Sequence, residues 1–426
     1  MISRKTLYFS LYLGILVFLA LPVVKIGPAR IEQLLVLVTF GIVFLDDLLK
    51  REVDFMILAY LVGGALVLVL ISMSSPYEKV AETGYYIKFL FIYPVGFYVG
   101  ARILSKVDFK TFLDIVDWAL LFYFVSWFVV MYIPLPESVL ERIIHFREFG
   151  WGREFLPYQG TFYEAGAIGV IVGSILLLSV MSRVEFDIWP RKKYYAWLLY
   201  GGIVYMMFLS KNKTVWLAYM LILLFLVIMK GYLKLTRSSF YTSPDKLRED
   251  PVLYKFHHIN GTYLIGAAIF LVAAFFIYNS LASHPFITAE EFNYKMQHER
   301  GAQFREAWDL IVKSNFWGGY GFGFVESYFK GKHIMGVGAG SGSINSVLLD
   351  SWLQGSILAV VYLSGIVWLG FDKRHFVTIV VPAFFLFFGL TNPIVAEELF
   401  LILGISYSIA SIRDQRELTG GVRIDR

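Results

Sequence analysis

Long apolar segments recur along the whole chain and are separated by short polar stretches. Each is long enough to cross roughly 30 Å of hydrocarbon as a helix, or nearly so. They lie at 7–24, 33–49, 55–73, 85–104, 115–135, 165–181, 195–209, 214–233, 260–281, 346–370, 376–390 and 393–411. The pattern predicts an all-α, polytopic membrane protein of about twelve spans, in which residues 1–426 form a single transmembrane domain.

Lysine and arginine bias predicts the orientation, because these residues favour the cytoplasmic side of short loops. The bias places both termini in the cytoplasm, a smaller outer loop at 136–164 and a larger one at 282–345. The first span follows Arg4 and Lys5 as a signal peptide would, yet Lys25-Gly-Pro offers no small-residue cleavage site. We therefore expect a retained anchor.

The loop at 282–345 is too long to be an ordinary connection, which favours a functional element or disorder. Its content favours a folded element. Apolar residues recur at helical spacing between Glu299 and Trp317, namely Phe304, Ala307, Trp308, Ile311 and Val312. This predicts an amphipathic helix lying on the bundle, and a shorter pattern at 139–144 predicts a second one.

The amino-acid composition excludes several classes of protein and of site. Hydrophobic residues make up 58% of the chain and charged residues only 17%, far from the balance of a soluble protein. The net charge of +5 is spread between apolar segments and forms no basic arm, which argues against nucleic-acid binding. The chain has no cysteine, so disulfides and thiolate metal sites are excluded.

The glycine-rich stretch Gly318–Gly323 needs its own explanation. It lacks the Lys-Ser/Thr pair of a phosphate-binding loop and the strand-turn-helix context of a dinucleotide fingerprint. Either it is a flexible connector, or its glycines let exposed backbone amides approach an anionic ligand. On the second interpretation, Gly319, Gly321 and Gly323 belong to a substrate-binding loop.

Basic residues of the predicted outer side form a second candidate group: Arg153, Lys211, Lys213, Arg300 and Arg305. Guanidinium groups bind phosphate oxygens bidentately, and several together can hold a diphosphate without a metal. The alternative is that each is solvated or paired with a neighbouring carboxylate.

Four stretches in order resemble the O-antigen polymerase and O-antigen ligase superfamily of bacterial polysaccharide assembly. They are Arg153–Ala165, Leu209–Thr214, Arg300–Gly323 and Asn345–Gly355. The resemblance covers roughly residue 150 to the end. It implies an enzyme of C-type glycosyltransferase architecture that acts on undecaprenyl-diphosphate-linked oligosaccharides at the outer face of the inner membrane. It also implies membrane lipids, a chain-length regulator and a flippase as partners, and Asn345 as a substrate-site residue.

The chain departs from the pattern that ligases resemble: His, then Asn, Ser or Gln, then nine intervening residues, then Gly. Here Ile344 occupies the histidine position, and His298 or His333 of the same loop are the possible substitutes. The Glu-Pro pair that often opens a family span is Glu164-Ala165. We therefore favour the polymerase over the ligase. A transporter or flippase comes third, because the two halves show no repeat.

The expected reaction is attack of a sugar hydroxyl on an anomeric carbon, with departure of lipid diphosphate. Arg153, Arg300 and Arg305, supported by Lys211 or Lys213, would stabilise the charge on the leaving group. A carboxylate would accept the hydroxyl proton, and the candidates are Glu164, Asp350, Glu397 and Glu398. No outer-side Asp-x-Asp motif is present, so we expect a metal-independent enzyme without a cofactor.

Overall fold

The computed structural model describes most of the chain. The described residues are 3–22, 24–26, 29–74, 87–136, 138–140, 161–162, 168–190, 193–210, 213–236, 290, 293–294, 297, 300–331, 344, 346–372, 375–390 and 397–411. Within these ranges the protein is almost entirely helical. The strands there are β1 (Lys25–Ile26) and β2 (Ala29–Arg30), which pair antiparallel between α1 and α2.

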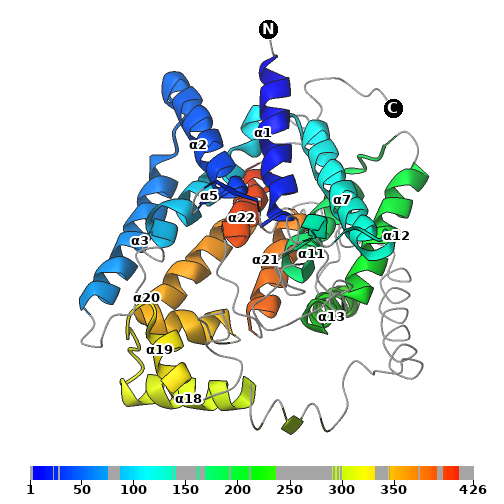
Figure 1. Cartoon of the computed structure of the whole chain (residues 1–426). Coiled ribbons are helices and arrows are strands. Elements are labelled where there is room, and N and C mark those ends of the chain that lie inside the picture. The colour runs from blue at the N-terminus through cyan, green and yellow to red at the C-terminus, as the bar shows by residue number, and fades with distance from the viewer. Residues whose placement is uncertain are drawn as a thin grey trace.

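The helices fall into two groups along the chain (Figure 1). The first group holds α1 (Arg4–Leu19), α2 (Ile31–Lys50), α3 (Phe55–Ser74), the π-helix η1 (Lys88–Ile92), α5 (Tyr93–Ala101), α6 (Ile103–Lys106) and α7 (Phe109–Tyr132). The second holds the π-helix η3 (Ile168–Val172), α11 (Gly173–Phe186), α12 (Lys193–Leu209), α13 (Lys213–Thr236), α18 (Arg300–Lys313), α19 (Phe324–Gly331), α20 (Val347–Leu369), α21 (Val377–Gly389) and α22 (Glu397–Ala410).

Four helical segments of the described ranges are long and apolar enough to cross a membrane: Phe55–Ser74, Phe109–Tyr132, Ile168–Phe186 and Val347–Leu369. Their outward faces are apolar as well. On α3, for example, Met56, Leu70 and Met73 are exposed. A helix that is apolar on its exposed face as well as its buried one suits a lipid environment. The fold is therefore consistent with a membrane protein.

A helix lies at each predicted segment except 260–281, which falls outside the described residues. The boundaries differ where local chemistry intervenes. The first helix ends at Leu19 rather than near residue 24, just before Pro22 and the β1–β2 hairpin. The fifth begins at Phe109 rather than 115, because the Asp108 carboxylate caps it through the amide of Thr111. The count of twelve spans stays a prediction.

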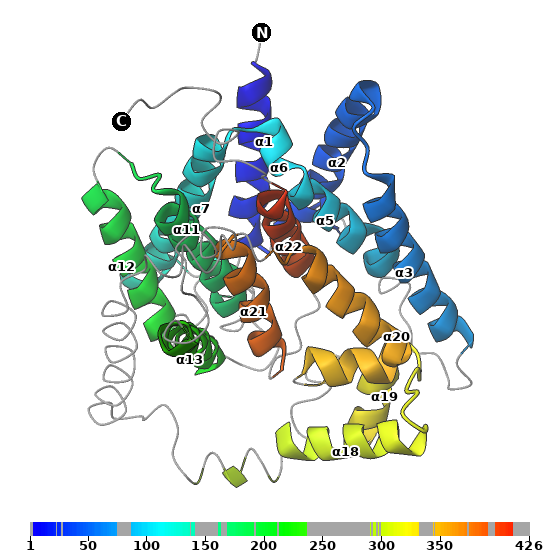
Figure 2. The same cartoon turned by 180° about the vertical axis from the view of Figure 1, so that it is seen from behind.

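At the centre of the bundle, α5 and α22 lie side by side (Figure 2). A Cβ on Gly100 would lie 2.2 Å from the carbonyl oxygen of Leu401, and one on Gly404 would lie 2.1 Å from that of Phe97. Both positions therefore need glycine, since the two backbones approach directly. Small residues of this kind let helices pack closely in a membrane, where burial of apolar surface alone drives little association.

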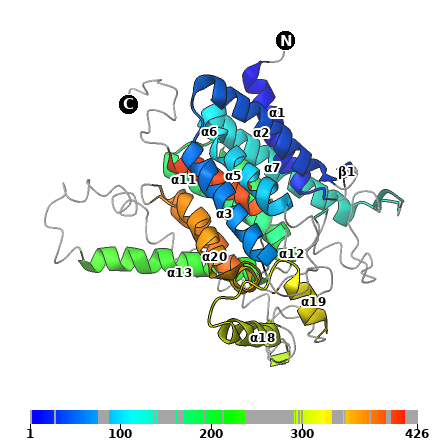
Figure 3. The ribbon, with the colours of Figure 1, turned by 90° about the vertical axis from the view of Figure 1, so that its left-hand side faces the viewer.

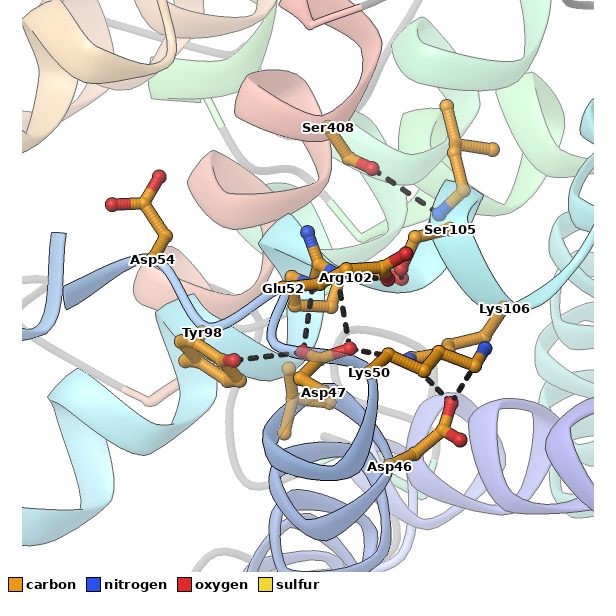
Figure 4. A network of polar contacts seen from close by, with 12 residues as sticks. Asp46, Asp47, Lys50, Glu52, Asp54, Tyr98, Arg102, Ser105, Lys106 and Ser408 are labelled. Carbon is orange, nitrogen blue, oxygen red and sulfur yellow. Dashed lines mark hydrogen bonds and ion pairs between the residues drawn. The ribbon is translucent and has the colours of Figure 1, made fainter.

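Two buried aspartates in the last turn of α2 tie α2 to α5 and α6 (Figure 4). The Asp47 carboxylate accepts hydrogen bonds from Arg102 Nε and Tyr98 Oη, each at 2.7 Å. Lys106, which is 1% exposed, donates to Asp46 at 2.6 Å and also to Asp47. Buried charges of both signs are thus held next to one another, which is the condition for keeping them charged away from water.

More exposed cations complete this charged cluster, which we define as Asp46, Asp47, Arg102 and Lys106 with their partners. Arg4 of α1 pairs with Asp46, and Lys50 lies 3.2 Å from the same carboxylate. Lys50, Arg102 and Lys106 thus converge on the two aspartates (Figure 4).

Candidate functional site

The helix α20 breaks in the middle, at the end of the bundle opposite the start of α1 (Figure 1). Ser356 has φ 66° and ψ −179°, so the helical hydrogen bonds stop there. The amide of Ile357, which in an unbroken helix would donate to Leu353, donates instead to the carbonyl of Trp317 at 3.0 Å. The first part of α20 therefore ends with carbonyls that need other donors.

The glycine-rich stretch supplies those donors. The amides of Gly319, Tyr320 and Gly321 donate to the carbonyls of Trp352, Leu353 and Gln354 at 3.3, 2.7 and 3.0 Å. Positive φ values of 68°, 72°, 97° and 87° occur at Gly318, Gly319, Gly321 and Gly323. A Cβ on Gly318 would lie 2.2 Å from the carbonyl oxygen of Trp352. The glycines allow the loop to fit against the broken helix.

This arrangement corrects the idea that exposed amides of this loop reach an anion. The amides of Gly319 and Gly321 are bonded to α20, and that of Gly323 donates to Gln354 Oε1 at 2.8 Å. A role of the loop in substrate binding through other atoms stays a prediction. The sequence signal was real, but what approaches the glycine backbone closely is a helix end of the same chain.

Asp350 lies buried in the first part of α20, close to the break. One carboxylate oxygen accepts from the amide of Ile344 at 3.0 Å, and the other accepts from Gln354 Nε2 at 2.9 Å. Gln354 in turn accepts from Gly323. No lysine or arginine of the described ranges forms an ion pair with Asp350. A buried carboxylate held by neutral donors alone is a suitable proton acceptor.

Glu398, at the start of α22, has a different environment. Its carboxylate lies 3.9 Å from Arg30 Nη1, and Arg30 Nε lies 2.6 Å from the buried carboxylate of Glu32. Sequence reasoning did not single out Arg30 or Glu32. The available signal was the charged pair Arg30 and Glu32 directly before the predicted span at 33–49. Nothing in the sequence indicated that Glu398, more than 360 residues further along the chain, would lie near this pair.

The two predicted arginines of α18 point in different directions. Arg305 is exposed and donates to the backbone carbonyl of Gln297 at 3.0 Å. Arg300 is half-buried and precedes Ala307 by two helical turns, so it shares the face of α18 that packs against α20. Of the two, Arg300 is the better placed to face the bundle.

The remaining predicted site residues cannot be placed in this arrangement. Arg153, Glu164, Lys211 and Asn345 lie outside the described residues, as do residues 141–144 of the second predicted helical pattern and most of the loop at 136–164. Lys213 and Glu397 begin α13 and α22, but their side chains are outside the described set.

An apolar cavity of about 110 Å³ lies between α20, α21 and α22. Its floor includes the buried rings of Phe385, Phe388 and Phe400. Its rim includes Leu348, Leu386 and Leu390, which are exposed on the surface of the bundle. Ser351, the residue after Asp350, also lines it. The cavity is suited to a hydrocarbon chain that enters from the lipid-facing side.

No family model and no curated protein matches this chain.

Proposed function

We propose that this chain is a membrane-embedded glycosyltransferase, a polysaccharide polymerase of the O-antigen type. In this proposal it joins undecaprenyl-diphosphate-linked oligosaccharide repeats at the outer face of the bacterial inner membrane, with both termini in the cytoplasm. The observation that carries the proposal is the buried carboxylate of Asp350, at a helix break and one residue from an apolar cavity that opens among exposed leucines.

The cavity supports a lipid-linked substrate. In the proposal, a hydrocarbon tail lies against Leu386 and Leu390, and its head group reaches Ser351, the residue after Asp350. The head group of such a carrier is a diphosphate, which needs positive charge. Arg300 lies on the face of α18 that packs against α20, and in the proposal Arg153, Lys211 and Lys213 supply the remaining charge. Arg305, which is exposed and bonds the carbonyl of Gln297, is left out of the proposed site.

The proposed reaction then divides between two groups of residues. Asp350 accepts the proton of the attacking sugar hydroxyl, while the arginines stabilise the negative charge that grows on the departing diphosphate. The bond from the anomeric carbon to the new oxygen forms as the bond to the diphosphate breaks. Glu398 has a cation 3.9 Å away, so it is the weaker candidate for the base.

The polymerase is preferred to the ligase because of Ile344. This residue replaces the histidine of the ligase pattern, and its side chain is fully buried in a small apolar cluster with Ala307, Ile311 and Leu353. Only its backbone amide touches Asp350. The position therefore contributes packing and a backbone donor in this chain, and it offers no ring nitrogen for proton transfer.

A lipid-linked sugar flippase is the second candidate, and the break in α20 favours it. Discontinuous helices are frequent at the binding sites of transporters. The two functions differ in their products, because a flippase moves its substrate unchanged whereas a polymerase makes a new glycosidic bond. Reconstituted protein that moves lipid-linked repeats across a vesicle bilayer without lengthening them would favour the flippase.

A deletion strain tests the polymerase directly. We expect its surface acceptor to carry a single repeat unit, because ligation continues while polymerisation stops. Gel electrophoresis of the surface polysaccharide gives the chain-length distribution. Long chains accumulating on the carrier lipid would identify a ligase instead. An unchanged chain-length distribution would contradict the assignment to either a polymerase or a ligase.

Substitution of Arg300 tests whether its guanidinium group binds the diphosphate of the substrate bidentately. Lysine keeps the charge but lacks the planar fork, so Arg300→Lys should lose nearly as much activity as Arg300→Ala, about 100-fold in single-turnover rate. Arg305→Lys is the matched comparison on the same helix. Its guanidinium is exposed and bonds a backbone carbonyl, so we expect a much smaller loss. If Arg300→Lys polymerises as fast as the parent protein, Arg300 does not bind the diphosphate bidentately.

A further inference from the structure

The helix α18 presents three faces rather than the two expected of an amphipathic helix. Ala307, Leu310 and Ile311 are buried against the bundle. Arg305, Asp309 and Lys313 follow one another at intervals of four on the opposite, exposed side. Between these two faces runs a third one, made of Phe304, Trp308 and Val312, also at intervals of four. Trp308 and Val312 were predicted to pack on the bundle, yet they are 49% and 43% exposed.

The third face continues into an aromatic patch, which we define as Trp308, Phe316, Trp317 and Trp352. The rings of Phe316 and Trp352 lie edge-on to Trp308, with centroids 6.0 and 6.5 Å away. The indole nitrogen of Trp352 donates to the carbonyl of Phe316 at 2.9 Å. Phe316 and Trp317 are 51% and 49% exposed. The patch is therefore held in place by specific contacts while its rings remain on the surface.

The patch also joins the apolar surface of α3. The indole nitrogen of Trp317 and Ile71 Cγ2 lie 3.1 and 3.4 Å from the position of a Cβ on Gly319, so the two side chains flank the same glycine. Ile71 belongs to the last turn of α3, a candidate membrane span, and its neighbours Leu70 and Met73 are exposed. The aromatic rings therefore begin where the lipid-facing surface of α3 ends.

We propose that the aromatic patch lies in the interfacial zone of the bilayer, and that α18 is an interfacial helix bound to lipid. Tryptophan favours this zone because its ring is apolar while its N–H is polar. Figures 1 and 2 show α18 running crosswise to α1 at one end of the bundle, as an interfacial helix does. The charged face carrying Arg305 and Asp309 is then turned to water. The partner is the boundary between head groups and acyl chains in the adjacent leaflet.

The absence of cysteine from the chain permits a clean test. A nitroxide label is attached to one new cysteine in each of Val312→Cys, Asp309→Cys and Met73→Cys, and the full chain is reconstituted in phosphatidylethanolamine–phosphatidylglycerol vesicles. Power saturation then compares collisions with oxygen, which concentrates in the bilayer, and with a water-soluble nickel chelate. Met73 on α3 serves as the lipid-facing reference.

We expect the oxygen-to-nickel accessibility ratio at Val312 to be several-fold higher than at Asp309, three residues away on the same helix, and to approach the ratio at Met73. Equal ratios at Val312 and Asp309 would overturn the proposal. So would a label at Val312 that is exposed to nickel and becomes immobilised on addition of soluble oligosaccharide, since the patch would then be a sugar-stacking surface. Neither result depends on whether the protein polymerises sugars.

Discussion

Asp350→Asn is expected to lower the single-turnover rate of polymerisation at least about 100-fold, the effect of losing a positioned proton acceptor. The asparagine oxygen can still accept from the amide of Ile344, but its new NH₂ group faces Gln354 Nε2, and a Gln354 amide that turns to accept from it no longer accepts from Gly323. Because the backbone hydrogen bonds across the break in α20 remain, we expect the fold to survive with a slightly lowered thermal midpoint. Rates are measured on purified protein with lipid-linked repeats, alongside the thermal unfolding midpoint.

Glu398→Gln is the matched comparison, because it also changes one buried carboxylate to an amide. We expect a smaller loss of rate, since Arg30 lies within ion-pair distance of Glu398 in the resting protein. If Glu398→Gln abolishes polymerisation while Asp350→Asn behaves like the parent, the base is Glu398 and the contacts of Asp350 are structural. Loss of rate in an Asp350→Asn variant that is already unfolded at the assay temperature would contradict the catalytic interpretation as well.

Lys106→Met should destabilise the protein by about 3–5 kcal/mol, the usual cost of leaving buried charge unpaired. Lys106 is 1% exposed and contacts both Asp46 and Asp47, so its removal leaves two carboxylates with too little compensation. The free energy of unfolding is measured by denaturant titration in detergent micelles, with the thermal midpoint as a second readout.

Lys50→Met provides the matched control, because Lys50 pairs with the same carboxylate of Asp46 from a side chain that is 41% exposed. An exposed pair contributes at most about 1 kcal/mol, so the two lysine variants should differ clearly. Similar, small losses for both would show that water reaches the charged cluster and that burial does not govern its strength. The double variant Lys106→Met with Asp47→Asn should recover part of the lost stability.

The positions of the helices were predictable because apolar runs of membrane length are visible in any sequence. Their ends were less predictable, since they depend on single residues such as Asp108, which caps α7, and Pro22, which follows α1. The break in α20 was not predicted. It falls at Gly355-Ser356 without a proline, and a glycine–serine pair interrupts a helix only when other groups take over the freed hydrogen bonds.

The sequence indicated individual candidate residues of the site, but it did not indicate which residues surround each of them. Asp350 and Glu398 were chosen as carboxylates of one predicted side, and the structure gives them different surroundings: neutral donors for the first and Arg30 near the second. The partners came from distant parts of the chain, and periodicity carries no information about such contacts. The glycines were recognised as unusual, but a sequence does not show whether the close neighbour is a ligand or a helix end.

The contact between Gly100 and Gly404 has a consequence for how the chain is made. The ribosome completes α22 about 300 residues after α5, so α5 stays in the nascent protein for roughly 15–60 s without the helix that fits its glycine face. During that time another surface, either lipid or an insertion factor, covers this face. The arrival of α22 is then the event that closes the centre of the bundle. A ribosome that stalls before α22 leaves α5 without the helix that fits its glycine face.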